Sequence, residues 1–140
     1  MTRFKNLFYK STAIICFAIL LGCTYTQTFQ PQFNDNQTAI VDSINAKYSF
    51  ENINVDGKKT SGSGGNHSTL TVKFINGKNI PTNDDSVTVI TKALALQIKK
   101  TLKDPQQFDS YTILFVTRTV DGSTTTEKNF GHEFKATELE

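Results

Sequence analysis

Hydrophobic residues recur along the chain with two periods, one typical of helices and one typical of strands. Two segments have the helical period, the first over 36–48 and the second, which Asp84 or Asp85 is expected to cap, running to about Leu102. The apolar stripes consist of Ile40, Val41, Ile44 and Tyr48 in the first segment and Val87, Ile90, Leu94, Ile98 and Leu102 in the second. These stripes predict a short helix and a longer one, each with one face directed toward a core.

Four segments have the alternation of β-strands, two after each predicted helix. In one of them, Leu70, Val72 and Phe74 alternate with threonine and lysine, which predicts a strand with one buried face. Another is apolar on both faces at mid-length, with Ile113 and Phe115 on one side and Leu114 and Val116 on the other, which predicts a strand covered on both sides. The four strands are expected at 49–55, 68–75, 111–120 and 128–136.

The order helix, hairpin, helix, hairpin predicts the fold class. The simplest packing is an α+β two-layer sandwich, in which a four-stranded antiparallel sheet carries both helices on one face. The folded part is expected to be a single domain over 36–140. Val-Asp-Gly occurs at both 55–57 and 120–122, so an internal duplication stays open.

The start of the chain has the layout of a secretory signal peptide. Arg3, Lys5 and Lys10 precede an uninterrupted apolar run over 13–21, and the small residue Gly22 follows it. A membrane-spanning helix needs about 20 apolar residues, so this run is too short for a comfortable span. We therefore expect 1–22 to be removed on export.

The end of this segment resembles the lipobox of bacterial lipoproteins. The matching residues are Leu20, Leu21, Gly22 and Cys23. The resemblance implies cleavage by signal peptidase II between Gly22 and Cys23, followed by lipidation of the Cys23 sulfur and acylation of its amino group. Several acyl chains together give stable attachment to a membrane.

The residues after Cys23 suggest where the protein is held. The segment 24–34 is uncharged and contains Pro31, so 23–35 is expected to be a flexible tether, of which the eleven residues 24–34 alone reach roughly 35 Å when extended. Thr24, Tyr25 and Thr26 stand where surface-exported lipoproteins of some bacteria have an acidic run, and where inner-membrane lipoproteins of enterobacteria have aspartate. By this resemblance, the expected location is the periplasmic face of the outer membrane.

Charge and cysteine content narrow the function classes. Three of the 15 basic residues precede Cys23, which leaves 12 against 13 acidic residues, so no basic face for nucleic acid is expected. The two cysteines are Cys16, inside the signal segment, and Cys23. The mature domain would therefore have no disulfide and would depend on its core.

The glycine-rich segment 60–68 is the best candidate for a binding loop. It resembles a phosphate loop only superficially, because a strand follows it rather than a helix, and Gly-Lys-Ser/Thr is missing. We expect a long hairpin loop, in which Ser63, Asn66 and His67 are possible binding residues.

No residues are assigned to catalysis, to a metal or to a cofactor. His67 and His132 are the only histidines and lie 65 residues apart, far from the short spacings of most zinc sites. His132 lies between Phe130 and Phe134 on one face of the last strand and is interpreted as a half-buried residue of the sheet. Val89 and Leu96 lie off the main helix stripe among lysines, either as ordinary surface hydrophobes or as a contact for a partner or a membrane surface.

The first functional hypothesis is a lipid-anchored envelope protein that acts as a non-enzymatic binding or structural module. Its expected partners are the membrane, through the anchor, and an envelope protein of unknown identity. Two alternatives stay open. One is an enzyme, or an accessory subunit of one, whose site forms only in the fold. The other is a soluble secreted domain in which the match at Cys23 is accidental.

Overall fold

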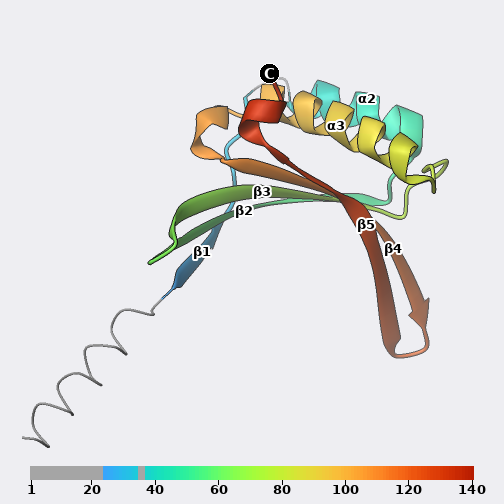
Figure 1. Ribbon diagram of the computed structural model, residues 1–140. Helices are drawn as coiled ribbons and strands as arrows, with labels where there is room; N and C mark the ends of the chain where they lie inside the picture. The colour runs from blue at the N-terminus through green and yellow to red at the C-terminus, as the bar shows by residue number, and fades with distance from the viewer. Residues whose placement is uncertain (1–23, 35–36) are drawn as a thin grey trace, which may run out of the picture.

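The computed structural model describes residues 24–34 and 37–140 (Figure 1). Within these residues, five strands and two α-helices follow one another in the order strand, helix, hairpin, helix, hairpin, with two short 3₁₀ helices between and after the later elements. The elements are β1 (Tyr25–Phe29), α2 (Gln37–Tyr48), β2 (Asn52–Gly62), β3 (Gly65–Ile75), α3 (Asp84–Thr101), η1 (Pro105–Gln107), β4 (Ser110–Asp121), β5 (Thr124–Lys135) and η2 (Ala136–Glu138).

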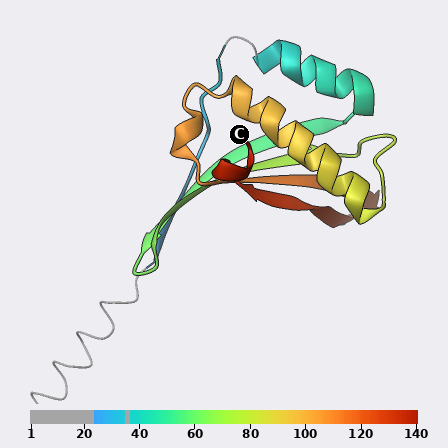
Figure 2. The same ribbon diagram turned by 45° about the horizontal axis from the view of Figure 1, so that its top comes forward.

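The strands form one mixed sheet in the order β1-β2-β3-β4-β5. Strand β3 pairs parallel with β4, and the other three neighbouring pairs are antiparallel. Both helices pack on the same face of the sheet and lie beside each other (Figures 1 and 2).

The predicted four-stranded antiparallel sheet is wrong in two respects, the first of which is the number of strands. The fifth strand is β1, inside the segment expected to be a flexible tether. It pairs with β2 from Tyr25 opposite Ser61 to Phe29 opposite Gly57. A carbon placed at Cβ of Gly57 would lie 2.7 Å from the Phe29 ring, so the bare glycine makes room for this aromatic anchor.

The second error is the strand direction. The chain leaves β3 at its C-terminal end, and α3 then returns along the sheet for about 27 Å, at 1.5 Å per residue over 18 residues. It therefore enters β4 at the end of the sheet where β3 began. A helix that crosses between neighbouring strands in this way requires those strands to be parallel.

The core lies between the helices and one face of the sheet. The alternating residues Leu70, Val72 and Phe74 of β3 are fully buried, as are Tyr111 and Ile113 of β4. Helix α3 covers them with a stripe of buried residues that includes Val87, Leu94, Ala95 and Ile98. The opposite face of the sheet has no helix over it and carries mostly polar residues, among them Thr69, Thr71 and Thr112.

Tyr111 fastens η1 to the core. Its hydroxyl donates a hydrogen bond to the Pro105 carbonyl oxygen at 2.9 Å. Burial, with a smaller contribution from the negative charge of Asp104, raises the pKa of Tyr111 to about 12. The phenol therefore stays neutral throughout the physiological range and acts as a structural donor.

The β2–β3 hairpin is longer than the sequence suggested. The strand expected to end at Asp56-Gly57 continues to Gly62, and the chain turns at Ser63-Gly64 between the paired residues Gly62 and Gly65. The two Val-Asp-Gly segments are therefore not equivalent, since the first lies within β2 and the second enters the turn after β4.

The two hairpin turns lie at opposite ends of the sheet because β3 and β4 run in the same direction. Along β3 and then β4, roughly 50 Å of strand separates the turns, at about 3.3 Å per residue. We call residues 61–66 the proximal tip, which lies beside the start of β1, and residues 117–130 the distal arm. Figure 1 shows the distal arm bending away from the helices, toward the lower right.

Candidate functional site

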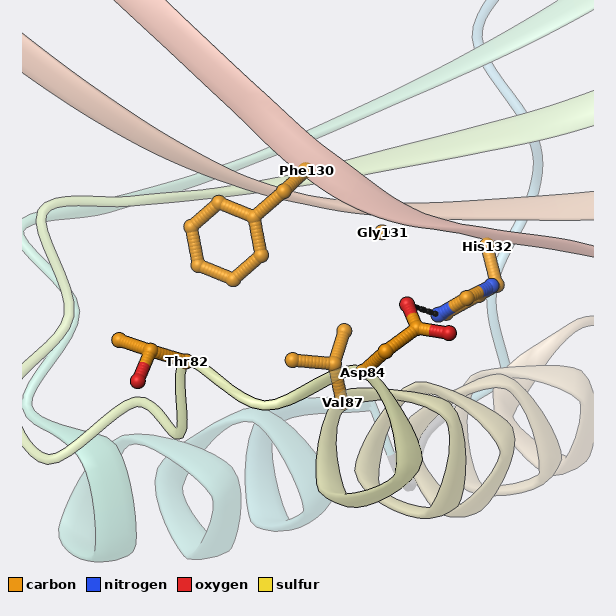
Figure 3. A pocket seen from close by; sticks show the side chains of 6 residues that line it. All are labelled: Thr82, Asp84, Val87, Phe130, Gly131 and His132. Carbon is orange, nitrogen blue, oxygen red and sulfur yellow. Dashed lines mark ion pairs between the residues drawn. The ribbon is translucent and has the colours of Figure 1, made fainter.

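A pocket of about 350 Å³ lies where the start of α3 meets the bend of β5. Val87 and the Phe130 ring form its apolar walls, while Asp84 and His132 lie at one end (Figure 3). The lining residues are Thr82, Asp84, Val87, Phe130, Gly131 and His132. A second pocket of about 290 Å³ shares Thr82 and Phe130 with it. The Phe130 side chain therefore forms part of the wall of both pockets.

The start of α3 positions the helical side of the pocket. Asn83 caps the helix, because its side-chain oxygen accepts a hydrogen bond from the Ser86 backbone N–H at 2.9 Å. Asp84 and Asp85 follow in the first turn, where negative charge interacts favourably with the helix dipole. The predicted cap at Asp84 or Asp85 is thus one or two residues late.

Gly131 positions the strand side of the pocket. Its φ of +155° is a backbone conformation that side-chain-bearing residues rarely adopt, and the carbonyl of Ile113 passes directly over the position where a Cβ would be. On either side of it, Phe130 and His132 face the helices. The Phe130 ring lies 5.5 Å from the ring of Phe115, centroid to centroid.

His132 joins β5 to the first turns of α3. Its Nε2 lies 3.0 Å from the Thr88 hydroxyl and 3.5 Å from an Asp84 carboxylate oxygen. The Thr88 hydroxyl also donates a hydrogen bond to the Asp84 backbone carbonyl at 3.0 Å. These contacts hold the strand and the helix together.

The pocket has the chemistry of a small binding site. Its walls suit an apolar group, and the Asp84 carboxylate, whose side chain is 89% exposed, suits a cation or a hydrogen-bond donor at the rim. Among the residues that the structure describes, no group of three or more His, Cys, Asp or Glu could hold a metal ion.

The structure does not bring the two histidines together. His67 lies at the β2–β3 turn, where its Nε2 is 3.3 Å from the Gly64 carbonyl oxygen. By the alternation of β3, its side chain is on the uncovered face of the sheet, whereas His132 is on the helical face.

The expected binding loop is a two-residue turn on an extended hairpin. Ser63 lies in the turn and Asn66 and His67 lie in β3, and all three are exposed. Gly22 and Cys23 lie outside the described residues. Of the two hydrophobic residues off the helix stripe, Val89 is 69% exposed, while Leu96 packs against the core.

Sequence reasoning missed the pocket as a site. It placed Phe130, His132 and Phe134 on one strand face, but the pocket also needs Thr82 from a loop nearly fifty residues earlier. A usable signal was Gly131, because an isolated glycine within a strand pattern often marks a bend or a close backbone approach.

In comparisons with known proteins, no family model, no curated protein and no solved structure matches the chain. Within residues 24–34 and 37–140, no helix combines the length and the apolar character needed to cross a bilayer.

Proposed function

We propose that this protein is a lipid-anchored component of the bacterial envelope that acts as a non-enzymatic binding module. The anchor rests on the resemblance of Leu20, Leu21, Gly22 and Cys23 to a lipobox, after a charged and then apolar start. The periplasmic face of the outer membrane is the proposed location. The binding role rests on the distal arm.

The exposure of the distal arm is the observation that carries the binding role. Every residue of 117–130 is exposed, and apart from Phe130, which packs on Phe115 at the base of the arm, no layer of the described structure covers this length of paired strand. Arg118 and Glu127 form a cross-strand ion pair at 2.8 Å that marks the register, although exposed pairs contribute little energy. An isolated two-stranded hairpin is marginally stable in water, so a partner that covers the arm would stabilise it.

The arm also offers the chemistry of a protein contact. Val120 is 66% exposed near its end and is surrounded by threonines, with charges of both signs at Arg118, Asp121 and Glu127. Strand β5 is an edge of the sheet, and an edge strand can pair with a strand from another chain. A polypeptide partner fits these features.

Replacing Cys23 with alanine is expected to abolish the anchor. The wild-type protein, isolated from host membranes, should begin at Cys23 and carry added acyl mass, whereas Cys23→Ala should stay a precursor or leave the membrane. Intact-mass spectrometry of membrane and soluble fractions measures both. A soluble wild-type chain without acyl mass would contradict the proposal.

Shortening the arm is expected to remove partner binding without unfolding the domain. Thr117 pairs with Lys128, so 118–127 can be replaced by Asn-Gly, the preferred two-residue hairpin turn. In the full-length protein, a photocrosslinking residue at Val120 should give a discrete envelope adduct in cells, and the same residue at Val89, which is about as exposed, should not.

One further measurement shows whether the shortened domain still folds. The thermal midpoint of the shortened variant should stay close to that of the wild type, because every residue removed is exposed. The same adduct at Val89 and Val120, or none at either, argues against the arm as a binding surface.

The second candidate is an enzyme or an enzyme accessory subunit. The pocket that contains His132 and Asp84 favours it, since a histidine beside a carboxylate is a common acid–base pair. The two candidate functions give His132 different importance. Under the binding proposal, His132→Gln leaves the Val120 adduct unchanged.

A further inference from the structure

The segment after Cys23 does not leave the domain on a long tether. Strand β1 begins at Tyr25, two residues after Cys23 in the sequence. Two residues span about 7 Å at most. Thr24 already lies against the hairpin, because a Cβ on Gly62 would be 3.2 Å from the Thr24 hydroxyl oxygen. The point of attachment therefore stays close to the sheet.

The pairing of β1 fixes which part of the sheet lies near that point. Tyr25 is opposite Ser61, and Ser61 is opposite Asn66 in β3. Figure 1 shows the start of β1 beside the β2–β3 turn, at the lower left. The proximal tip is therefore the part of the folded domain nearest to Cys23, and the distal arm is at the other end of the sheet.

The side chains of the proximal tip suit the polar surface of a bilayer. Residues 61–66 are serine, glycine and asparagine, with no charged group among them. Tyr25, beside them, is 66% exposed, and tyrosine is enriched where membrane meets water. Lys58 and Lys59 follow behind the tip on β2, both exposed, and their long side chains can reach lipid phosphates.

We infer that the proximal tip rests on the lipid head groups, so that the domain is held on the membrane in one orientation. This inference rests on the proposed function, because it needs the lipid at Cys23. Its partner is the bilayer surface next to the anchor. Strand β1 orients the domain, and the stacking of Phe29 on Phe108, with ring centroids 5.9 Å apart, keeps β1 in place.

Tryptophan fluorescence tests the orientation, because the chain has no tryptophan of its own. Ser63→Trp places the probe in the turn of the proximal tip, and Val89→Trp places a matched exposed probe on α3, in the helix layer above the sheet (Figure 1). The acylated proteins are inserted into phosphatidylethanolamine–phosphatidylglycerol vesicles, with or without a lipid that carries a nitroxide on its head group. The Ser63→Trp indole is expected to lose most of its emission to the nitroxide, and the Val89→Trp indole is expected to keep it.

A third variant tests the role of β1. Phe29→Ala removes the side chain that packs over Gly57, so β1 should detach and 23–34 should become a true tether. Quenching at Ser63→Trp is then expected to fall several-fold, while circular dichroism shows that the domain remains folded.

The outcomes separate the anchor from the orientation. Acylated, vesicle-bound protein with equal quenching at positions 63 and 89 overturns the orientation and leaves the anchor intact. Quenching at position 63 that Phe29→Ala does not change overturns the role of β1. A chain without acyl mass that does not bind vesicles overturns both.

Discussion

Gly131→Ala is expected to lower the free energy of unfolding by more than about 3 kcal/mol, a large part of the 5–15 kcal/mol typical of a domain. Two causes combine. The φ of +155° is strained for any residue with a side chain, at a cost of about 1–3 kcal/mol. In addition, the new Cβ would overlap the Ile113 carbonyl oxygen and lie 3.0 Å from the Leu114 Cα, both part of the neighbouring strand.

Gly131→Ala would also alter the pocket, because Gly131 lines it between Phe130 and His132. Relief of the overlap requires β5 to move away from β4, which would shift the His132 ring from the Thr88 hydroxyl. Urea unfolding followed by circular dichroism measures the loss of stability.

Two other glycines provide matched controls. Gly122 has a φ of +59° with open space around it, so Gly122→Ala isolates the backbone cost, about 1–2 kcal/mol. Gly64 has nothing within 4 Å of a new Cβ and should tolerate alanine with almost no change. If Gly131→Ala costs no more than Gly122→Ala, the close approach of the Ile113 carbonyl is not important for stability.

The parts of the fold that could be predicted are those with one buried and one exposed face. Helix α3 and strand β3 are examples, since Val87, Leu94 and Ile98 at helical spacing and Leu70, Val72 and Phe74 at strand spacing are all buried. In such elements the hydrophobic pattern follows directly from the packing. Helix α2, at Gln37–Tyr48, likewise lies on a segment with a helical period.

The missed strand segments have no buried face. Residues 25–28 are all exposed, and β1 is held by backbone pairing and by Phe29 on Gly57, a contact between residues far apart in sequence. Residues 58 and 59 of β2 are likewise exposed, so no hydrophobic alternation marks the strand there. Tertiary pairing, rather than local preference, makes these residues extended.

The parallel pair of strands could have been predicted from the order of the elements. A helix as long as α3, placed between two hairpins and packed on their sheet, returns the chain to the end where β3 began. In a fully antiparallel sheet, the connection from β3 to β4 would have to begin and end at the same end of the sheet. The direction of β4 relative to β3 therefore follows from the order and lengths of the elements, which the sequence already indicates.

Phe74→Ala is expected to cost about 3–5 kcal/mol, the range for truncation of a fully buried aromatic residue. The Phe74 side chain has no exposed surface, and its ring lies 4.7 Å from that of Phe50 and 6.0 Å from that of Phe115. Alanine would leave a void between the loop that precedes β2 and the middle of the sheet. Urea unfolding should show a lower midpoint with an unchanged dependence on denaturant.

Phe130→Ala is the matched control, because it makes the same truncation at another ring that contacts Phe115. Phe130 is 37% exposed and lies over the pocket, so its removal opens the surface rather than the core, and should cost less than half as much. Equal losses at the two positions would mean that the distal arm packs as tightly as the core. An arm that needs no partner for its stability would remove the main support for the proposed binding role.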